Sequence, residues 1–148
     1  QEEREKGFML TNLIGSIFKN ENITSVALEE LNEIIMSECK DFVNTELVEL
    51  IKKLEVKNCY IVTHGVTEYQ LEKIHRTGLY SFFCKINVVQ DTKKSSVEAI
   101  CEEFKDHEVI FVDDKEKRFI DLDFKKYPNL RKVLYTGPES IKEIFKTN

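Results

Sequence analysis

Two kinds of hydrophobic pattern divide the chain near residue 58. Before this point apolar residues recur every three or four positions, which is the spacing of a helix with one buried face. After it, short continuous apolar runs alternate with helical stretches. This alternation is typical of parallel strands joined by right-handed helical crossovers. The pattern therefore predicts a helical first third followed by an α/β region.

Three amphipathic helices are predicted in the first third. Their expected ranges are 8–18, about 25–39 and 46–54. A strand over residues 8–10 is a weaker alternative to the first helix. The other two helices are preceded by side chains that can cap a helix, namely Thr24 or Ser25, and Asn44 or Thr45.

Four apolar segments after residue 58 predict strands, at 59–62, 82–89 (in two pieces, 82–83 and 86–89), 109–112 and 132–135. Four helices are expected between and after them. Two of these helices carry a possible capping box, Thr67 with Gln70 and Ser95 with Glu98. The first of the four is expected to end near Gly78, and the last two are expected over 115–125 and about 139–145.

The stretch from Glu108 to Asp114 is the most informative part of the sequence. Its four central residues are apolar without interruption, which is typical of a strand buried on both faces. Asp113 and Asp114 follow directly. In an open α/β sheet ligands bind beyond the carboxyl ends of the strands, so this acidic pair is placed to hold a cation. Two carboxylates together suit Mg²⁺. The alternative is that the pair only caps a helix over 115–122.

Polar residues also follow the other predicted strands. Thr63 comes after the first strand, and Lys93 and Lys94 lie before the helix that follows the second. A hydroxyl, an ammonium group and two carboxylates at one edge of a parallel sheet predict a site for phosphate and Mg²⁺. Each feature also has an ordinary explanation, because a Thr after a strand is usually a turn residue and a Lys before a helix is usually solvated.

Composition narrows the classes of partner. The chain has 148 residues, 33% of them charged, and a net charge of −5, which argues against a nucleic-acid partner bound by general electrostatics. No apolar run approaches the roughly 18 residues of a transmembrane helix, and the charged first residues do not make a signal peptide. A soluble, cytoplasmic protein without a membrane partner is therefore expected. The four cysteines form no C-x-x-C pair, which argues against a zinc site.

From Val43 to its end the chain resembles the haloacid dehalogenase superfamily of phosphatases and related hydrolases. Residues 61–65 are similar to the second motif of that family, and residues 83–86 to the segment before its third motif. Lys94 is preferred over Lys93 as the family's lysine, since it directly precedes Ser95. Residues 109–117 are similar to the fourth motif, whose acidic pair binds Mg²⁺.

The resemblance implies a three-layer α/β/α fold with a Rossmann-like parallel sheet over residues 43–148 and a small helical cap over residues 1–42. It implies that Thr63 and Lys94 are catalytic, that His64 and Gly65 join them in binding a small phosphorylated molecule, and that the Asp113 and Asp114 carboxylates hold Mg²⁺.

One part of the family pattern is missing. The family's nucleophile is the first Asp of an Asp-x-Asp motif that ends the first strand, and Asp41 is the only aspartate before Asp91. The expected explanation is a strand upstream of Gln1. The alternative is that residues 8–12 take its place without carboxylates. Three classes of function follow: a Mg²⁺-dependent phosphomonoester hydrolase with a phosphoaspartyl mechanism, an inactive relative that binds a phosphorylated ligand or a protein partner, and an α/β domain in which the acidic pair is only a cap.

Overall fold

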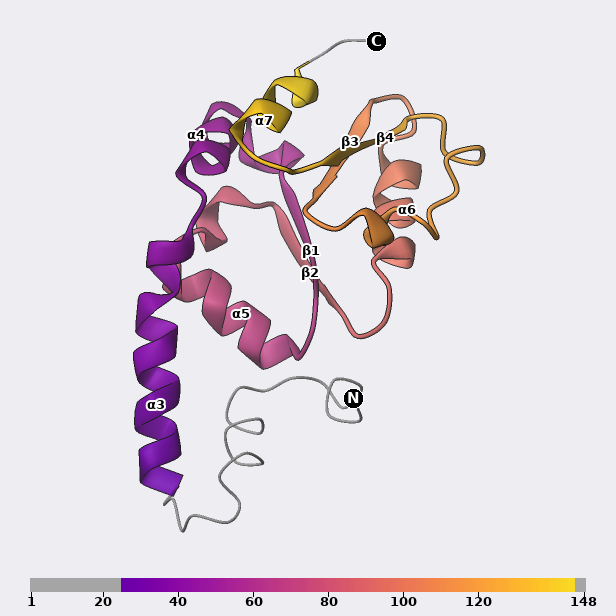
Figure 1. Ribbon diagram of the computed structural model, residues 1–148. Helices are drawn as coiled ribbons and strands as arrows, with labels where there is room; N and C mark the ends of the chain where they lie inside the picture. Colours follow the sequence, from indigo (N-terminus) through magenta and orange to yellow (C-terminus); the bar gives the residue numbers. More distant parts are fainter. Residues whose placement is uncertain (1–24, 146–148) are drawn as a thin grey trace. The chain divides into compact units, whose positions relative to one another are not determined.

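The structure of the protein is a computed structural model that describes residues 25–145, the side chains of residues 25–28 excepted. The predictions for residues 8–18 and for a Thr24 cap lie outside the described residues. The chain divides into two compact units, whose boundary in the sequence falls between Gln90 and Asp91. The elements of both units are drawn in Figure 1, and each unit is described by itself.

The first unit contains three described α-helices and two strands. In chain order they are α3 (Ser25–Ser37), α4 (Thr45–Lys53), β1 (Tyr60–His64), α5 (Thr67–Arg76) and β2 (Lys85–Val89). The strands β1 and β2 pair in parallel, with Tyr60 opposite Lys85 and His64 opposite Val89. Helix α5 connects the two strands and contacts both β2 and α3. The Arg76 guanidinium on α5 binds both carboxylate oxygens of Glu33 on α3.

In its described residues the second unit also contains two strands, but no α-helix lies between them. Its elements are α6 (Lys94–Glu103), β3 (Val109–Asp113), β4 (Leu130–Leu134) and α7 (Pro138–Ile144). The strands β3 and β4 are also parallel, with Val109 opposite Leu130 and Asp113 opposite Leu134. Helix α6 contacts β3, and α7 contacts β4 (Figure 1).

Over residues 25–145 the protein is therefore mixed α/β, with two parallel two-stranded sheets and five α-helices. The predicted α/β class and the parallel pairing of successive strands are confirmed. The three-layer arrangement and the boundary between residues 42 and 43 stay predictions. In the same part of the chain no helix is both long and apolar enough to cross a membrane.

Several local predictions are confirmed. The Asn44 side chain accepts a hydrogen bond from the backbone N–H of Leu47 and so caps α4 as expected. Helix α5 ends just before Gly78, which has a φ of 72° and donates its N–H to the carbonyl of His75. The four strands lie at the four apolar segments, although residues 80–82 form a 3₁₀ helix instead of part of β2.

Both predicted capping boxes are wrong. The residue before α5 is Val66 and the residue before α6 is Lys93, and neither makes a side-chain capping bond. The glutamine and glutamate of the two boxes have partners elsewhere. Gln70 accepts from the Thr63 hydroxyl, and Glu98 accepts from the Lys94 ammonium group. The side chains that the boxes required are therefore used in other hydrogen bonds, between β1 and α5 for Gln70 and within α6 for Glu98.

The helix predicted over 115–125 is also wrong, because only Glu116–Arg118 form a short 3₁₀ helix. Phe119 and Leu122 are buried at helical spacing, which explains the misleading pattern. The Asp123 carboxylate accepts hydrogen bonds from the backbone N–H groups of Lys125 and Lys126. A carboxylate that bonds its own following backbone favours a turn over a helix.

The buried apolar residues of the second unit lie mainly on β3, β4, α6 and the loop between the strands. They are Val97, Cys101, Phe111, Phe119, Leu122, Tyr127, Leu130 and Val133. Asn129 connects the end of α6 to this core, because its side-chain amide faces three backbone carbonyls, those of Cys101, Phe104 and His107, at 3.1–3.3 Å. These carbonyls lie at the C-terminal end of the helix and just beyond it, where intrahelical partners run out.

Replacing Asn129 by alanine is expected to lower the free energy of unfolding by about 1–3 kcal/mol, because half-buried carbonyls would lose their donor. Urea unfolding followed by circular dichroism measures the change. The matched control is Asn58→Ala at an exposed position, which is expected to change stability by less than about 0.5 kcal/mol. Equal effects of the two substitutions would contradict the role of Asn129.

Candidate functional site

The end of β3 carries a buried ion pair. Asp113 is the last residue of the strand, and its side chain is 4% exposed. The Lys93 ammonium group lies 2.6 Å from Oδ2 of Asp113, and the Lys93 side chain is 15% exposed. The other carboxylate oxygen, Oδ1, accepts the backbone N–H of Lys115 at 3.0 Å. Both oxygens of a buried carboxylate are therefore held, as burial of a charge requires.

Local structure explains why these two residues meet. Lys93 is the residue directly before α6, the helix that contacts β3. Its ammonium nitrogen also lies 5.6 Å from the centre of the Phe111 ring, two residues before Asp113 on the same face of the strand. The aromatic ring and the carboxylate thus face the same lysine from one side of β3.

The Asp113 carboxyl group is shifted toward its ionised form. Burial by itself raises the pKa of Asp113. The hydrogen bond and the positive charge of Lys93, together with the N–H of Lys115, more than offset this effect, so the pKa of Asp113 lies below its usual range. The Asp113 carboxyl group is therefore ionised at neutral pH and paired with the Lys93 ammonium group.

Asp114, the other expected metal ligand, is exposed. Within the described part of the chain no group of three or more His, Cys, Asp or Glu side chains is arranged to hold a metal ion. Asp113 and Asp114 therefore offer two neighbouring carboxylates, of which one is buried and one is exposed. This set suits a cation that takes its remaining ligands from water or from a bound phosphate.

Lys94, the lysine preferred from the sequence, is the first residue of α6 and lies in a different hydrogen-bond network. Its ammonium group donates to Oε1 of Glu98 and to the carbonyl of Asp121, both at 2.6 Å. Glu98 also accepts the backbone N–H of Asp123 at 3.3 Å, and its bond with Lys94 raises the pKa of that lysine. Lys94 therefore ties α6 to the loop after Phe119, whereas the lysine in contact with Asp113 is Lys93.

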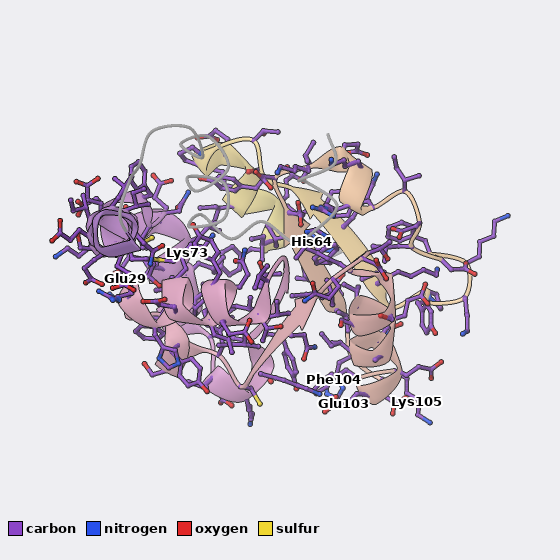
Figure 2. All side chains as sticks on the ribbon, turned by 90° about the horizontal axis from the view of Figure 1, so that it is seen from below. Glu29, His64, Lys73, Glu103, Phe104 and Lys105 are labelled. Carbon is purple, nitrogen blue, oxygen red and sulfur yellow. The ribbon has the colours of Figure 1, made fainter. Side chains whose placement is uncertain are left out.

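In the first unit, Thr63 lies within β1 opposite Val88, one position before the strand ends. It was expected to follow the strand. Its hydroxyl donates to Oε1 of Gln70 at 3.3 Å. His64, which is labelled in Figure 2, is the last residue of β1, and it is exposed.

Gly65 forms the turn that follows β1. Its N–H donates to the carbonyl of Val89 and its carbonyl accepts from the Gln90 side chain, both at 3.0 Å. Its φ of 142° is a conformation that residues with a Cβ rarely adopt. A Cβ added to Gly65 would also lie 2.7 Å from Nε2 of Gln70. A glycine is thus required here both by the backbone and by the neighbouring glutamine.

The structure describes the predicted site residues in two groups. Thr63, His64 and Gly65 belong to the first unit, and Lys94, Asp113 and Asp114 to the second. Sequence reasoning missed the roles of three residues, namely Gln70, Gln90 and Glu98. The spacing of Gln70 from Thr67 and of Glu98 from Ser95 predicts helix capping instead of these bonds. No pattern around Gln90 predicts its bond to Gly65.

The sequence also contains an Asp-x-Asp triplet, Asp121-Leu122-Asp123, which does not end a strand. The Asp121 carbonyl and the Asp123 carboxylate are engaged in loop hydrogen bonds. The triplet therefore belongs to the loop between β3 and β4 and does not take the position of the nucleophile in the resembled family.

Comparison with known proteins gives no relative for this chain. No family model matches it, and neither a curated protein nor a solved structure matches it significantly.

Replacing Asp113 by asparagine is expected to cost about 3–5 kcal/mol of stability at pH 7, because Lys93 would be left without its counter-charge. The lowered pKa gives a second expectation. A carboxylate with a lowered pKa in the folded state stabilises the protein above its unfolded pKa of about 3.9 and loses this contribution as the pH falls below it. The stability of the wild type is therefore expected to fall below about pH 4 more steeply than that of Asp113→Asn.

Urea unfolding between pH 2.5 and pH 7 measures both effects. The matched control is Asp114→Asn at the exposed neighbouring carboxylate, which is expected to change stability at pH 7 by less than about 0.5 kcal/mol. Parallel pH profiles for the wild type and Asp113→Asn would show that the ion pair does not stabilise the fold.

Proposed function

We propose that this protein is a Mg²⁺-dependent phosphomonoester hydrolase of the haloacid dehalogenase type, with the three-layer α/β/α fold of that family. The observation that supports the proposal best is the end of β3, where the buried Asp113 carboxylate is held ionised by Lys93 beside the exposed Asp114. A lysine and two carboxylates at the carboxyl end of a parallel strand are suited to bind a metal and a phosphate together.

The residues at the end of β3 fit Mg²⁺. Oδ2 of Asp113 accepts from Lys93, and Oδ1 accepts from the Lys115 N–H. Each oxygen thus uses one lone pair and can accept a further ligand with the other. Together with Asp114 this gives the one or two carboxylates that Mg²⁺ takes from proteins, the other ligands being water and phosphate oxygens. When bound, Mg²⁺ would neutralise the charge that develops on the phosphoryl oxygens.

The remaining site residues would act on the phosphoryl group. A lysine ammonium group neutralises its negative charge, and we assign this role to Lys93 in preference to Lys94, because Lys94 is held by Glu98 and Asp121. In the first unit, taken by itself, the Thr63 hydroxyl and the His64 side chain offer donors of the kind that bind a phosphoryl oxygen, whereas the Gly65 N–H is bonded to Val89.

A second function, binding of a phosphorylated ligand or a protein partner without hydrolysis, is favoured by a specific observation. The described strands end in Thr63-His64, Val88-Val89, Val112-Asp113 and Val133-Leu134, and none of them ends in an Asp-x-Asp motif. An aspartyl nucleophile would have to come from outside residues 25–145. Turnover therefore distinguishes the two functions, whereas binding is common to both.

The test is the release of phosphate from p-nitrophenyl phosphate with and without Mg²⁺. The wild type is expected to be active only with Mg²⁺, and Lys93→Gln is expected to lose about 100-fold in rate, as when one transition-state donor is removed. Because Lys93→Gln leaves the buried Asp113 carboxylate without its counter-charge, circular dichroism is used to show that the variant is folded before the rates are compared. The matched control is Lys94→Gln, which is expected to retain most of the activity.

Equal losses in the two lysine variants would contradict the assignment to Lys93, and a rate indifferent to Mg²⁺ would contradict the enzyme proposal. If no phosphate is released, calorimetric titration with inorganic phosphate and Mg²⁺ tests the binding function. Binding that is lost in Lys93→Gln would support a site without turnover, and the absence of binding would contradict a phosphate site in either function.

A further inference from the structure

The hydrogen of the Thr63 hydroxyl is already used in this structure. A threonine hydroxyl has a single hydrogen, and here it is donated to Oε1 of Gln70 at 3.3 Å. The unprotonated oxygens of a phosphate accept hydrogen bonds and do not donate them. Thr63 therefore cannot donate to a phosphate while Gln70 presents its carbonyl oxygen.

Gln70 is held in place by its surroundings. It lies in the first turn of α5, and its side chain is half-buried against the turn that follows β1. The missing side chain of Gly65 makes room for it, since a Cβ on Gly65 would lie 2.7 Å from Nε2 and 3.3 Å from Cγ of Gln70. The backbone of Gly65 is itself fixed by Val89 and Gln90. Gln70 thus bonds Thr63 and packs closely against Gly65.

A glutamine can resolve the conflict because its amide carries both an acceptor and a donor. A half-turn of the amide places Nε2 in the position of Oε1. The Nε2 group then donates to Oγ1 of Thr63, and the hydroxyl hydrogen is released for another acceptor. Both arrangements keep the contact between residues 63 and 70, so the change needs no movement of the backbone.

We propose that Gln70 is a positioning residue for Thr63, whose amide turns when phosphate binds so that Nε2 donates to the hydroxyl and the hydroxyl donates to the phosphate. This inference rests on the proposed function, because it concerns the same phosphate site. It adds a residue that is outside the motifs from which that site was predicted.

The variant Gln70→Glu tests the proposal, because an ionised carboxylate has the shape of the amide but can only accept. Thr63 would then have to donate to residue 70. The affinity for inorganic phosphate with Mg²⁺ at pH 8 is expected to fall about tenfold or more, as when a hydrogen bond to a charged group is lost. The ratio between wild-type and variant affinity is expected to shrink toward pH 5, because a protonated glutamate can again donate.

The negative charge of the glutamate requires a control. In a Thr63→Val background the hydroxyl is absent, so Gln70→Glu is expected to weaken phosphate binding by less than about twofold if it acts through Thr63. A full loss in that background would mean that the charge repels phosphate directly, and it would overturn the proposal. Titrations followed by ¹⁵N NMR provide the affinities and show that each variant is folded.

A measurement on the wild type keeps the proposal testable if Gln70→Glu does not fold. The side-chain NH₂ resonances of Gln70 are expected to shift when inorganic phosphate is added, and this shift is expected to be absent in Thr63→Val. Unchanged Gln70 resonances in a wild type that binds phosphate would overturn the proposal.

The outcomes separate this inference from the proposed function. A wild type that binds no phosphate would overturn both. A wild type that binds phosphate through Thr63, with Gln70→Glu equal to it at every pH, would overturn only the role of Gln70.

Discussion

The second unit depends on the buried ion pair between Lys93 and Asp113. A carboxylate that is 4% exposed needs a counter-charge, and the nearest one comes from the residue directly before α6. The pair therefore fixes where α6 begins relative to the end of β3. It also keeps the Asp113 carboxyl group ionised at the carboxyl end of a parallel strand, which is where ligands bind in open α/β sheets. Structural and proposed functional roles thus reside in the same two side chains.

The neighbouring lysine shows how the loop after β3 is held. Lys94 bonds to Glu98 on its own helix and to the carbonyl of Asp121, and Glu98 in turn accepts the N–H of Asp123. Two adjacent lysines therefore connect α6 to two different segments, the end of β3 and the loop that follows it. In the first unit the turn after β1 is organised in a similar way, by side chains of Gln70 and Gln90 around Gly65.

Much of this fold follows from local patterns. The run from Val109 to Val112 has the continuous apolar character of a buried parallel strand, and Asn44 has both the right chemistry and the right place to cap α4. Such features depend on residues close together in the sequence, which is why they could be predicted.

The features that could not be predicted depend on contacts between residues far apart in the sequence, or on which of two neighbouring residues begins a helix. Successive residues of a helix point about 100° apart, so whether Lys93 or Lys94 faces Asp113 depends on which of them starts α6. The spacing of Gln70 from Thr67 fits a capping box equally well, and only the strand beside it shows that its partner is Thr63. For the loop around Leu122, buried apolar residues at helical spacing concealed the turn made by Asp123.

The most direct test of the central claim, that the end of β3 binds a divalent cation, is the broadening of backbone amide resonances by Mn²⁺. This ion takes the same oxygen ligands as Mg²⁺ and broadens the signals of nuclei near it. The account predicts that the amides of Asp113, Asp114 and Lys115 broaden first and that added Mg²⁺ restores them. Broadening that is strongest elsewhere, as at Asp121 and Asp123, or that is spread over the exposed carboxylates and indifferent to Mg²⁺, would contradict it.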